Sequence, residues 1–375
     1  MSVLSDDINA KWLFGSVLPY AEPAWARGYP SPYYNDSHRR LRAAMRSWVD
    51  ENLMPHTLEW ETSQVLPDWL WEKAAKDGVI MPMAAGAAIP QEWAGKYPIM
   101  GNIAPEEWDG FHDLTIHDEF ERVGGVGIHN GLVGCTWITG GMYAQYFVTL
   151  VKESTGDFTV LVIPRTQGVT TRHITLSGST VAGTAFVDFE SVQVPMDMVV
   201  GVRGQGLKYI MSNFNHERLF VGFQALRCAR VCLEDSIRET FGKKLVDHSV
   251  IRFKISNMSR ETEALQTWIE SLIYQLPQLS SEESVFLMAG ITAQLKAHSG
   301  IVLESVAREA IQIMGGVGLT RGGRGERVER IWRDVKAITI PGGSEEILLD
   351  LGTRWALKIN KQLRAAASEA GKSRL

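Results

Sequence analysis

The chain has 375 residues, of which 45% are hydrophobic and 22% are charged, with 14 prolines. These ordinary globular values exclude a mainly disordered, collagen-like or disulfide-scaffold protein. The net charge of −5 comes without any block of Lys or Arg, which argues against a nucleic-acid partner and an anionic membrane surface. The three cysteines have neither a disulfide nor a zinc-ligand pattern, so we expect a reducing compartment and no metal.

The first part of the chain, residues 1–134, predicts a helical domain. Asn35, Asp36 and Ser37 offer N-caps for a helix whose apolar residues recur at helical spacing and which ends at Pro55. A short helix is expected between Pro67 and Gly78, and another from about Asp113 to Gly124. The Gly- and Pro-rich stretch 82–105 is predicted to be irregular. The richest apolar run, Val79–Ile89, overlaps this stretch and is shorter than the roughly 20 residues of a membrane helix, so we expect no membrane span. We also expect no signal peptide.

The helical spacing of apolar residues is lost in residues 135–202, and the new pattern predicts a small antiparallel β domain. β-branched and aromatic runs of strand length cover 146–151, 158–163, 169–176 and 184–189, and turn residues separate them. No helix fits between the strands, so a βαβ unit is excluded.

Residues 203–375 predict long helices packed as a four-helix bundle. One runs from about Gln205 to Arg238, and a second from Asp247 to Pro277. A third is expected to be capped by Ser281 and to end at Gly315, and a fourth to start at Ser344 with two glutamates in its first turn.

This layout resembles the acyl-CoA dehydrogenase superfamily, a mainly α fold with an N-terminal helical domain, a middle β domain and a C-terminal bundle. Five segments carry the resemblance in order along the chain: Trp137–Gly141, Gly204–Tyr209, Arg238 with 240–243, Gln312–Gly318, and Arg333-Asp334 with Gly343-Ser344. The resemblance therefore covers most of the chain.

Glu217 is the candidate catalytic base. Ile210, Phe214, Glu217, Val221 and Gln224 share one mostly apolar helix face, where desolvation favours a proton-accepting carboxylate. The structural alternative is an ion pair with Arg218 or with an arginine of a neighbouring helix. The resemblance favours the base, because in the long-chain and isovaleryl branches of the family the base occupies this position, directly before an arginine. In that setting Arg218 orients the base or the substrate.

The other location of the base in the family is the loop before the last helix, where this chain has Gly342. A glycine cannot accept a proton, which disfavours the medium- and short-chain arrangement. The Gly342 N–H remains a candidate donor to the thioester oxygen, where charge develops as the α-proton leaves.

The resemblance implies FAD as hydride acceptor for an acyl-CoA substrate. Trp137 and Thr139 are expected beside the flavin ring, Arg238 and Phe241 at the pyrophosphate and adenine end. Gln312, Gly315 and Gly316 are expected to reach FAD of a neighbouring subunit, which implies a homodimer or homotetramer. Ser344 and Glu346 replace the Thr and Gln usual in the family. Each of these residues also has an ordinary structural explanation, such as glycines that end a helix, and the spacing of His112 and His117 indicates no metal site.

The sequence departs from the family at Gly134-Cys135, where a few dozen residues are absent, and the basic turn before Arg238 is shortened. The missing strands are expected to leave open sheet edges. Two alternatives follow: a flavin-free family member that acts as a scaffold or partner subunit, and an incorrect intron boundary in the gene.

The last residues, Ser373-Arg374-Leu375, are a close variant of the Ser-Lys-Leu peroxisomal address. We therefore expect recognition by the peroxisomal import receptor and a peroxisomal enzyme, the alternative being a solvated helix tail. Oxygen or an electron-transfer flavoprotein is the expected electron acceptor. Because family members in fungi serve secondary-metabolite and toxin pathways, such a pathway is expected beside fatty-acid oxidation.

Overall fold

The computed structural model describes residues 14–93, 95–133, 138–237, 239–240 and 243–372. The helices of the N-terminal part are α2 (Asp36–Asn52), α3 (Thr57–Ser63), α4 (Asp68–Lys76), α5 (Ile80–Ala85), α6 (Gly110–Phe120) and α7 (Gly127–Val133). Asn35 caps α2 as expected, since its side-chain oxygen accepts from the Ser37 N–H at 2.8 Å.

The middle part forms two small antiparallel sheets. β1 (Tyr146–Lys152), β2 (Phe158–Pro164) and β5 (Val199–Val200) make one, in the order β1-β2-β5; β3 (Val169–His173) and β4 (Ala185–Phe189) make the other. The expected open edge is present, because β1 pairs with β2 alone among the described strands and Val148 on it is 67% exposed.

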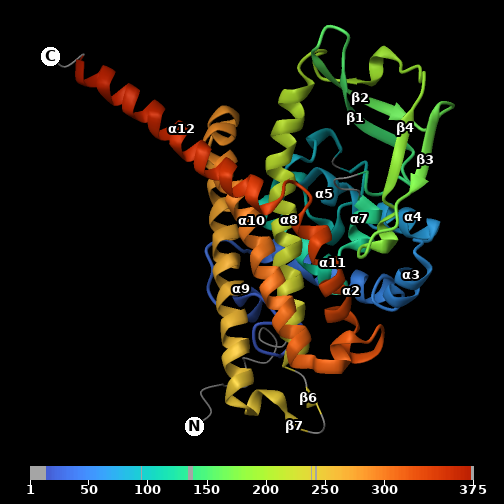
Figure 1. Ribbon diagram of the computed structural model, residues 1–375, viewed down its shortest axis with the longest axis vertical. Coiled ribbons are helices and arrows are strands. Elements are labelled where there is room, and N and C mark those ends of the chain that lie inside the picture. Colours follow the sequence, from blue (N-terminus) through green and yellow to red (C-terminus); the bar gives the residue numbers. More distant parts are fainter. Residues whose placement is uncertain (1–13, 94, 134–137, 238, 241–242, 373–375) are drawn as a thin grey trace.

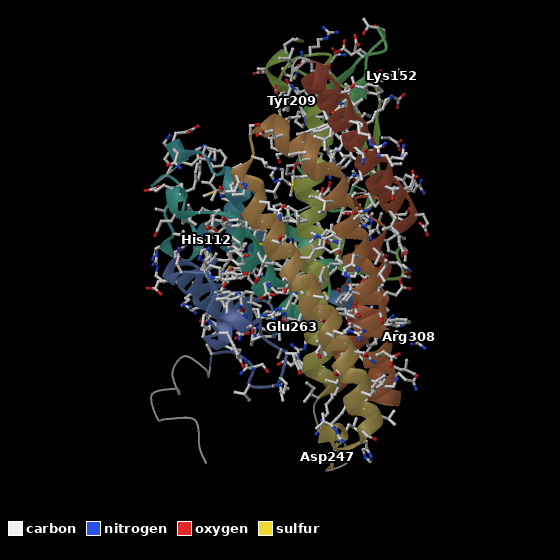
Figure 2. All side chains as sticks on the ribbon, turned by 90° about the vertical axis from the view of Figure 1, so that its left-hand side faces the viewer. His112, Lys152, Tyr209, Asp247, Glu263 and Arg308 are labelled. Atoms are coloured by element: carbon white, nitrogen blue, oxygen red, sulfur yellow. The ribbon has the colours of Figure 1, made fainter. Side chains whose placement is uncertain are left out.

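The C-terminal part contains the long helices α8 (Gly206–Ser236), α9 (Ser249–Gln275), α10 (Ser281–Met314), α11 (Glu326–Thr339) and α12 (Glu345–Lys372). The strands β6 (Glu239–Thr240) and β7 (Lys243–Lys244) lie between α8 and α9. α8 runs from the sheets at one end of the molecule to these strands at the other, and α12 extends away from the bundle (Figure 1). Tyr209 marks the sheet end and Asp247 the opposite end (Figure 2).

Two main hydrophobic cores hold these parts together. One is built from the bundle helices and also takes in Trp25, Phe111 and Val126 of the N-terminal part. The other lies within the N-terminal helices and includes Val181 of the sheet region. The predicted fold class, mainly α with a small β part, is confirmed. Some residues of the N-terminal helical part lie in the core of the bundle, and others form the second core.

A buried ionic network adds a polar connection between the N-terminal part and the bundle. Arg227 of α8 lies 3.0 Å from Asp118 and 3.3 Å from Glu22. Arg42 and Arg46 of α2 each pair with Glu22 and Glu119. Arg122 also pairs with Glu119 and with Asp50, so four arginines face four carboxylates and the charges balance within the network.

Several local predictions were wrong. The helix α11 was not predicted, and it packs against both α8 and α10, whereas α12 packs against α10 and then leaves the bundle. The N-cap of α10 is Ser280, not Ser281: the Ser280 hydroxyl accepts from the Glu283 N–H, and the Glu283 carboxylate accepts from the Ser280 N–H. α3, α5 and β5 were also missed.

The most apolar long helix is α10, not the stretch at Val79–Ile89. The segment Glu282–Leu319 is long and apolar enough to cross a membrane by length and composition, and more than half of its richest window is buried. Because α10 contacts α8, α9, α11 and α12, its hydropathy follows from its central place in the bundle.

Candidate active site

Glu217 lies on the face of α8 predicted from its spacing. Its side chain is half-buried, while Val221 and Gln224 further along the same face are buried. Burial lowers the pKa of the adjacent Arg218 guanidinium, and the Glu217 carboxylate opposes that shift. The base candidate therefore lies at the margin of the interior with a cationic neighbour.

The loop that connects α11 to α12 lies against this part of α8. Arg218 Nε donates to the Gly342 carbonyl oxygen at 3.2 Å. Gly342 has a φ of +72°, and a Cβ added there would lie 3.7 Å from Arg218 Cγ. The two chain positions that the resemblance offers for a base are thus brought together in space, with the carboxylate on α8 and a glycine on the loop.

Lys296 of α10 is a site residue that sequence reasoning missed. Its ammonium donates to the carbonyl oxygens of Thr339 at 2.5 Å and Gly343 at 2.8 Å, and the residue is 1% exposed. Burial, aided by Arg218, lowers the pKa of Lys296 to about 8, while Glu217 opposes the shift. The available signal was its spacing with Thr292, Ser299 and Leu303, which are all buried on one face of α10.

The other predicted site residues that the structure describes lie in three places. Ser344 immediately precedes α12, with its carbonyl accepting from the Leu348 N–H at 3.0 Å, and Glu346 is exposed in the first turn. Gln312, Gly315 and Gly316 lie exposed at the end of α10. Thr139 is half-buried in the turn before β1. Trp137, Arg238, Phe241, Ser373, Arg374 and Leu375 lie outside the described residues.

Gly316 provides a test of whether this surface suits a bound group. Its φ lies outside the left-handed region, and a Cβ added there would meet nothing within 4 Å. A glycine costs conformational entropy, and the described chain gives no steric reason for one at this position. Close approach of another molecule is such a reason, so the exposed end of α10 fits contact with a cofactor bound partly by another subunit.

Two protein-family models match most of the chain. The family model described as acyl-CoA dehydrogenase, N-terminal domain, matches residues 35–146, and the C-terminal domain model matches residues 204–357. The chain belongs to the acyl-CoA dehydrogenase family. It is therefore an oxidoreductase of the acyl-CoA dehydrogenase type.

Two fungal relatives match over nearly their full length. "Acyl-CoA dehydrogenase apdG" of Emericella nidulans is 33% identical over 96% of this chain and 99% of that protein. "Acyl-CoA dehydrogenase AFT10-1" of Alternaria alternata is 30% identical over 91% of this chain and 96% of that protein. The first alignment spans 439 positions, more than the 375 residues of this chain, which agrees with several dozen missing residues.

Solved acyl-CoA dehydrogenase structures show the same fold. A putative acyl-CoA dehydrogenase from Mycobacterium smegmatis has a TM-score of 0.74 at 21% identity, covering 86% of this chain and 98% of that one. An acyl-CoA dehydrogenase from Bacillus anthracis, described as complexed with FAD, has a TM-score of 0.70 at 19% identity, covering 91% and 70%.

The family signature Arg333-Asp334 has a structural role in this acyl-CoA dehydrogenase. The buried Asp334 carboxylate accepts from the backbone N–H groups of Ser179 at 2.5 Å and Val126 at 3.0 Å. Burial raises the pKa of Asp334 to about 7. The residue thereby ties α11 to the start of α7 and to the turn before β4.

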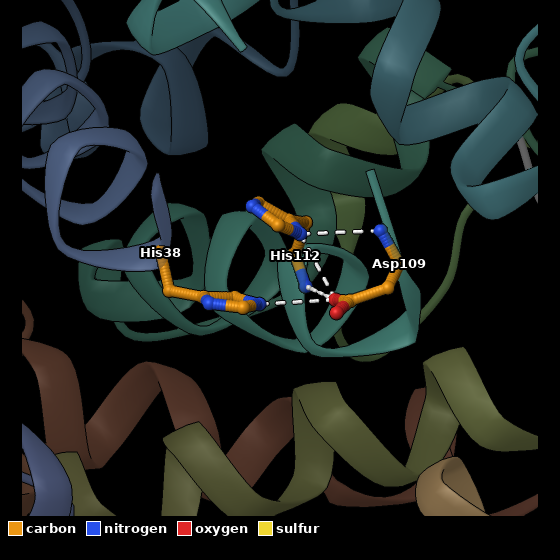
Figure 3. A group of neighbouring side chains, drawn as sticks. All are labelled: His38, Asp109 and His112. Carbon is orange, nitrogen blue, oxygen red and sulfur yellow. Dashed lines mark hydrogen bonds and ion pairs between the residues drawn. The ribbon is translucent and has the colours of Figure 1, made fainter. Parts of the chain in front are cut away.

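His38, Asp109 and His112 lie close enough together to suggest a metal site (Figure 3). The two imidazole rings stack at 3.8 Å with planes 26° apart, and His38 Nε2 and His112 Nδ1 lie 3.0 and 2.9 Å from the same oxygen, Asp109 Oδ1. His38 Nδ1 and His112 Nδ1 lie 3.1 Å from the backbone N–H groups of Asn35 and Asp109, which start α2 and α6. These contacts join the N-caps of the two helices. The prediction that His112 binds no metal stays a prediction.

His117 also has a structural environment. It is buried, and its ring stacks on His129 at 4.9 Å and on Phe220 at 4.7 Å. Burial holds its pKa well below the usual value for histidine. His117 thus packs among aromatic rings in the interior.

A cavity of about 650 Å³ lies elsewhere in the described part of the molecule. Its lining includes Glu22, Arg46, Arg122, Arg227 and Arg327. Arg227 is ten residues beyond Glu217 on α8, which places it roughly 15 Å further along the helix axis. The charged cavity is therefore separate from the candidate catalytic carboxylate.

Proposed function

We propose that this protein catalyses the α,β-dehydrogenation of an acyl-CoA thioester, with Glu217 as general base and FAD as hydride acceptor. The observation that carries the proposal is the hydrogen bond between Arg218, the residue next to Glu217, and the Gly342 loop. The names of its relatives support the same reaction class.

In this proposal the Glu217 carboxylate removes the α-proton of the thioester. The Gly342 N–H donates to the thioester oxygen, where negative charge develops, and preorganised donors of this kind lower the barrier to such a step. Arg218 holds the loop through the Gly342 carbonyl and places a positive charge beside the base. When bound, FAD supplies the acceptor for the β-hydride, because no side chain can accept a hydride.

Thr139, Gln312, Gly315, Gly316 and Ser344 are the described residues that would hold FAD, together with Trp137, Arg238 and Phe241. The open surface at Gly316 supports a site shared between subunits. Leu357 and Leu363 of the projecting α12 are each 66% exposed (Figure 1), which supports burial of this helix in a homodimer or homotetramer.

Purified protein tests both the cofactor and the assembly. We expect a yellow protein with one FAD per chain and a light-scattering mass that is a multiple of 41.7 kDa. A folded, colourless protein that takes up no added FAD would instead support the flavin-free scaffold, which the missing segment motivates. Sequencing the transcript across Gly134-Cys135 tests the third explanation, an incorrect intron boundary.

The proposed location is the peroxisome. Deleting Ser373-Arg374-Leu375 from a protein tagged at its N-terminus should move it from peroxisomes to the cytosol, as seen by fluorescence microscopy with a peroxisomal marker. Peroxisomal import of the shortened protein would exclude this tripeptide as the signal.

We also propose that oxygen or an electron-transfer flavoprotein accepts the electrons, and that the substrate belongs to a fatty-acid or secondary-metabolite pathway. Rapid reoxidation of the reduced protein by air would favour oxygen, and slow reoxidation a protein acceptor. A thermal-shift screen with acyl-CoAs of different length and branching would identify the acyl group, because a bound ligand stabilises the folded state.

A further inference from the structure

Lys296 occupies a position whose energetic cost requires an explanation. A lysine is rarely buried unless it is paired, yet this residue is 1% exposed in the middle of the central helix α10. Its ammonium is satisfied by two backbone carbonyls, those of Thr339 and Gly343, which flank the loop between α11 and α12.

A second cation holds the same loop from another helix. Arg218 of α8 donates to the carbonyl of Gly342, so Thr339, Gly342 and Gly343 are all held by buried basic side chains. Gly342 and Gly343 have φ values of +72° and +118°, a conformation that an unrestrained loop would readily leave. Two tethers from two helices thus fix a segment that its own sequence leaves flexible.

Lys296 lies close to Arg218, the neighbour of Glu217 in the chain, since a Cβ added at Gly342 would lie 3.7 Å from Arg218 Cγ and 3.8 Å from Lys296 Cε. Among the described residues, the charged groups that influence the Lys296 ammonium are Arg218 and Glu217, both of α8; α11 and the loop contribute the two carbonyl oxygens. A positive charge near a carboxylate favours its ionised form, which is the form that accepts a proton.

We propose that Lys296 is the positioning residue of this active site: it fixes the Ile340–Ser344 loop against α10, beside Arg218 of α8, and keeps a positive charge near Glu217. This inference rests on the proposed function for its catalytic part. The tether itself is a property of the loop and is measurable without substrate.

Lys296→Met tests the proposal, because methionine keeps the apolar stem and removes both the charge and the donors. Lys336→Met is the matched control, since Lys336 on α11 is exposed and pairs with Glu304 at 2.6 Å. In hydrogen exchange followed by mass spectrometry, the peptide that contains Ile340–Ser344 should exchange faster in Lys296→Met than in wild type and the control.

The kinetic readout separates the charge from the tether. In anaerobic mixing with an acyl-CoA, Lys296→Met should reduce the flavin about 10- to 100-fold more slowly, since small misplacements of reacting groups carry costs of this size. The acid limb of its pH–rate profile should move to higher pH, because Glu217 loses a neighbouring cation. Lys296→Gln keeps hydrogen-bond donors but removes the charge. It should therefore move the acid limb of the pH–rate profile in the same direction as Lys296→Met, with slower hydrogen exchange in the loop than Lys296→Met.

Unchanged loop exchange together with an unmoved acid limb would overturn the proposal. If Lys296→Met does not fold, Lys296→Gln decides it by the position of the acid limb. If no acyl-CoA reduces the wild-type protein, the proposed function fails, whereas the exchange experiment still decides whether Lys296 holds the loop.

Discussion

Glu217→Gln should keep the flavin spectrum of the wild-type protein but slow acyl-CoA-driven bleaching by about 10²–10⁴-fold, the usual contribution of a general base. Glutamine preserves the size of the side chain and its ability to accept a hydrogen bond, but it cannot take the α-proton. Stopped-flow absorbance under anaerobic conditions measures the rate directly.

Glu304→Gln is the matched control for this substitution, because Glu304 is an exposed carboxylate on α10 that pairs with Lys336. It should reduce the flavin at the wild-type rate. Equal rates for Glu217→Gln and Glu304→Gln would remove Glu217 from the mechanism, and the structural alternative, an ion-paired glutamate, would then stand.

Arg227→Met should destabilise the fold by about 3–5 kcal/mol, because it leaves an uncompensated negative charge in a buried network. Arg227 is 2% exposed and faces Asp118, Glu22 and Glu119. Without it, Arg42, Arg46 and Arg122 face four carboxylates, these three and Asp50. Urea unfolding followed by circular dichroism measures the loss as a lower midpoint.

Two further variants separate the effect of the Arg227 charge from that of its geometry and of ion pairs in general. Arg227→Lys keeps the charge but not the fork-shaped donor, so its midpoint should lie between those of Met and wild type. Arg203→Met breaks an exposed pair with Glu153 and should leave the midpoint unchanged. A wild-type midpoint for Arg227→Met would show that the buried network does not stabilise the contact between the N-terminal part and the bundle.

The periodic elements of the fold could be predicted from the sequence because their signals are local. The Asn35 cap, the apolar spacing on α2 and the strand-length runs of β1 and β2 each specify their element without distant partners. α11 was missed although its buried residues Val328, Ile331, Val335 and Ile338 recur at helical spacing, so a local signal was present. Its helix is stabilised by packing against α8 and α10.

The candidate site could be predicted only in part. Helical spacing and resemblance pointed to Glu217 and Gly342, but no local pattern shows that Arg218 reaches the Gly342 carbonyl across 124 residues of sequence. The pairing of Lys296 with Thr339 and Gly343 is equally non-local. The role of Asp334 likewise depends on Val126 and Ser179, which only tertiary packing brings to it.

The most direct test of the central claim is α-proton exchange with solvent. A 3-thia-acyl-CoA has sulfur in place of the β-carbon, so hydride loss is blocked and only deprotonation can be observed. In D₂O, mass spectrometry should find deuterium at the α-carbon with the wild-type protein and about 10²–10⁴-fold slower incorporation with Glu217→Gln. Equal incorporation by the two proteins, or none by a yellow wild-type protein across a panel of chain lengths, would contradict the account.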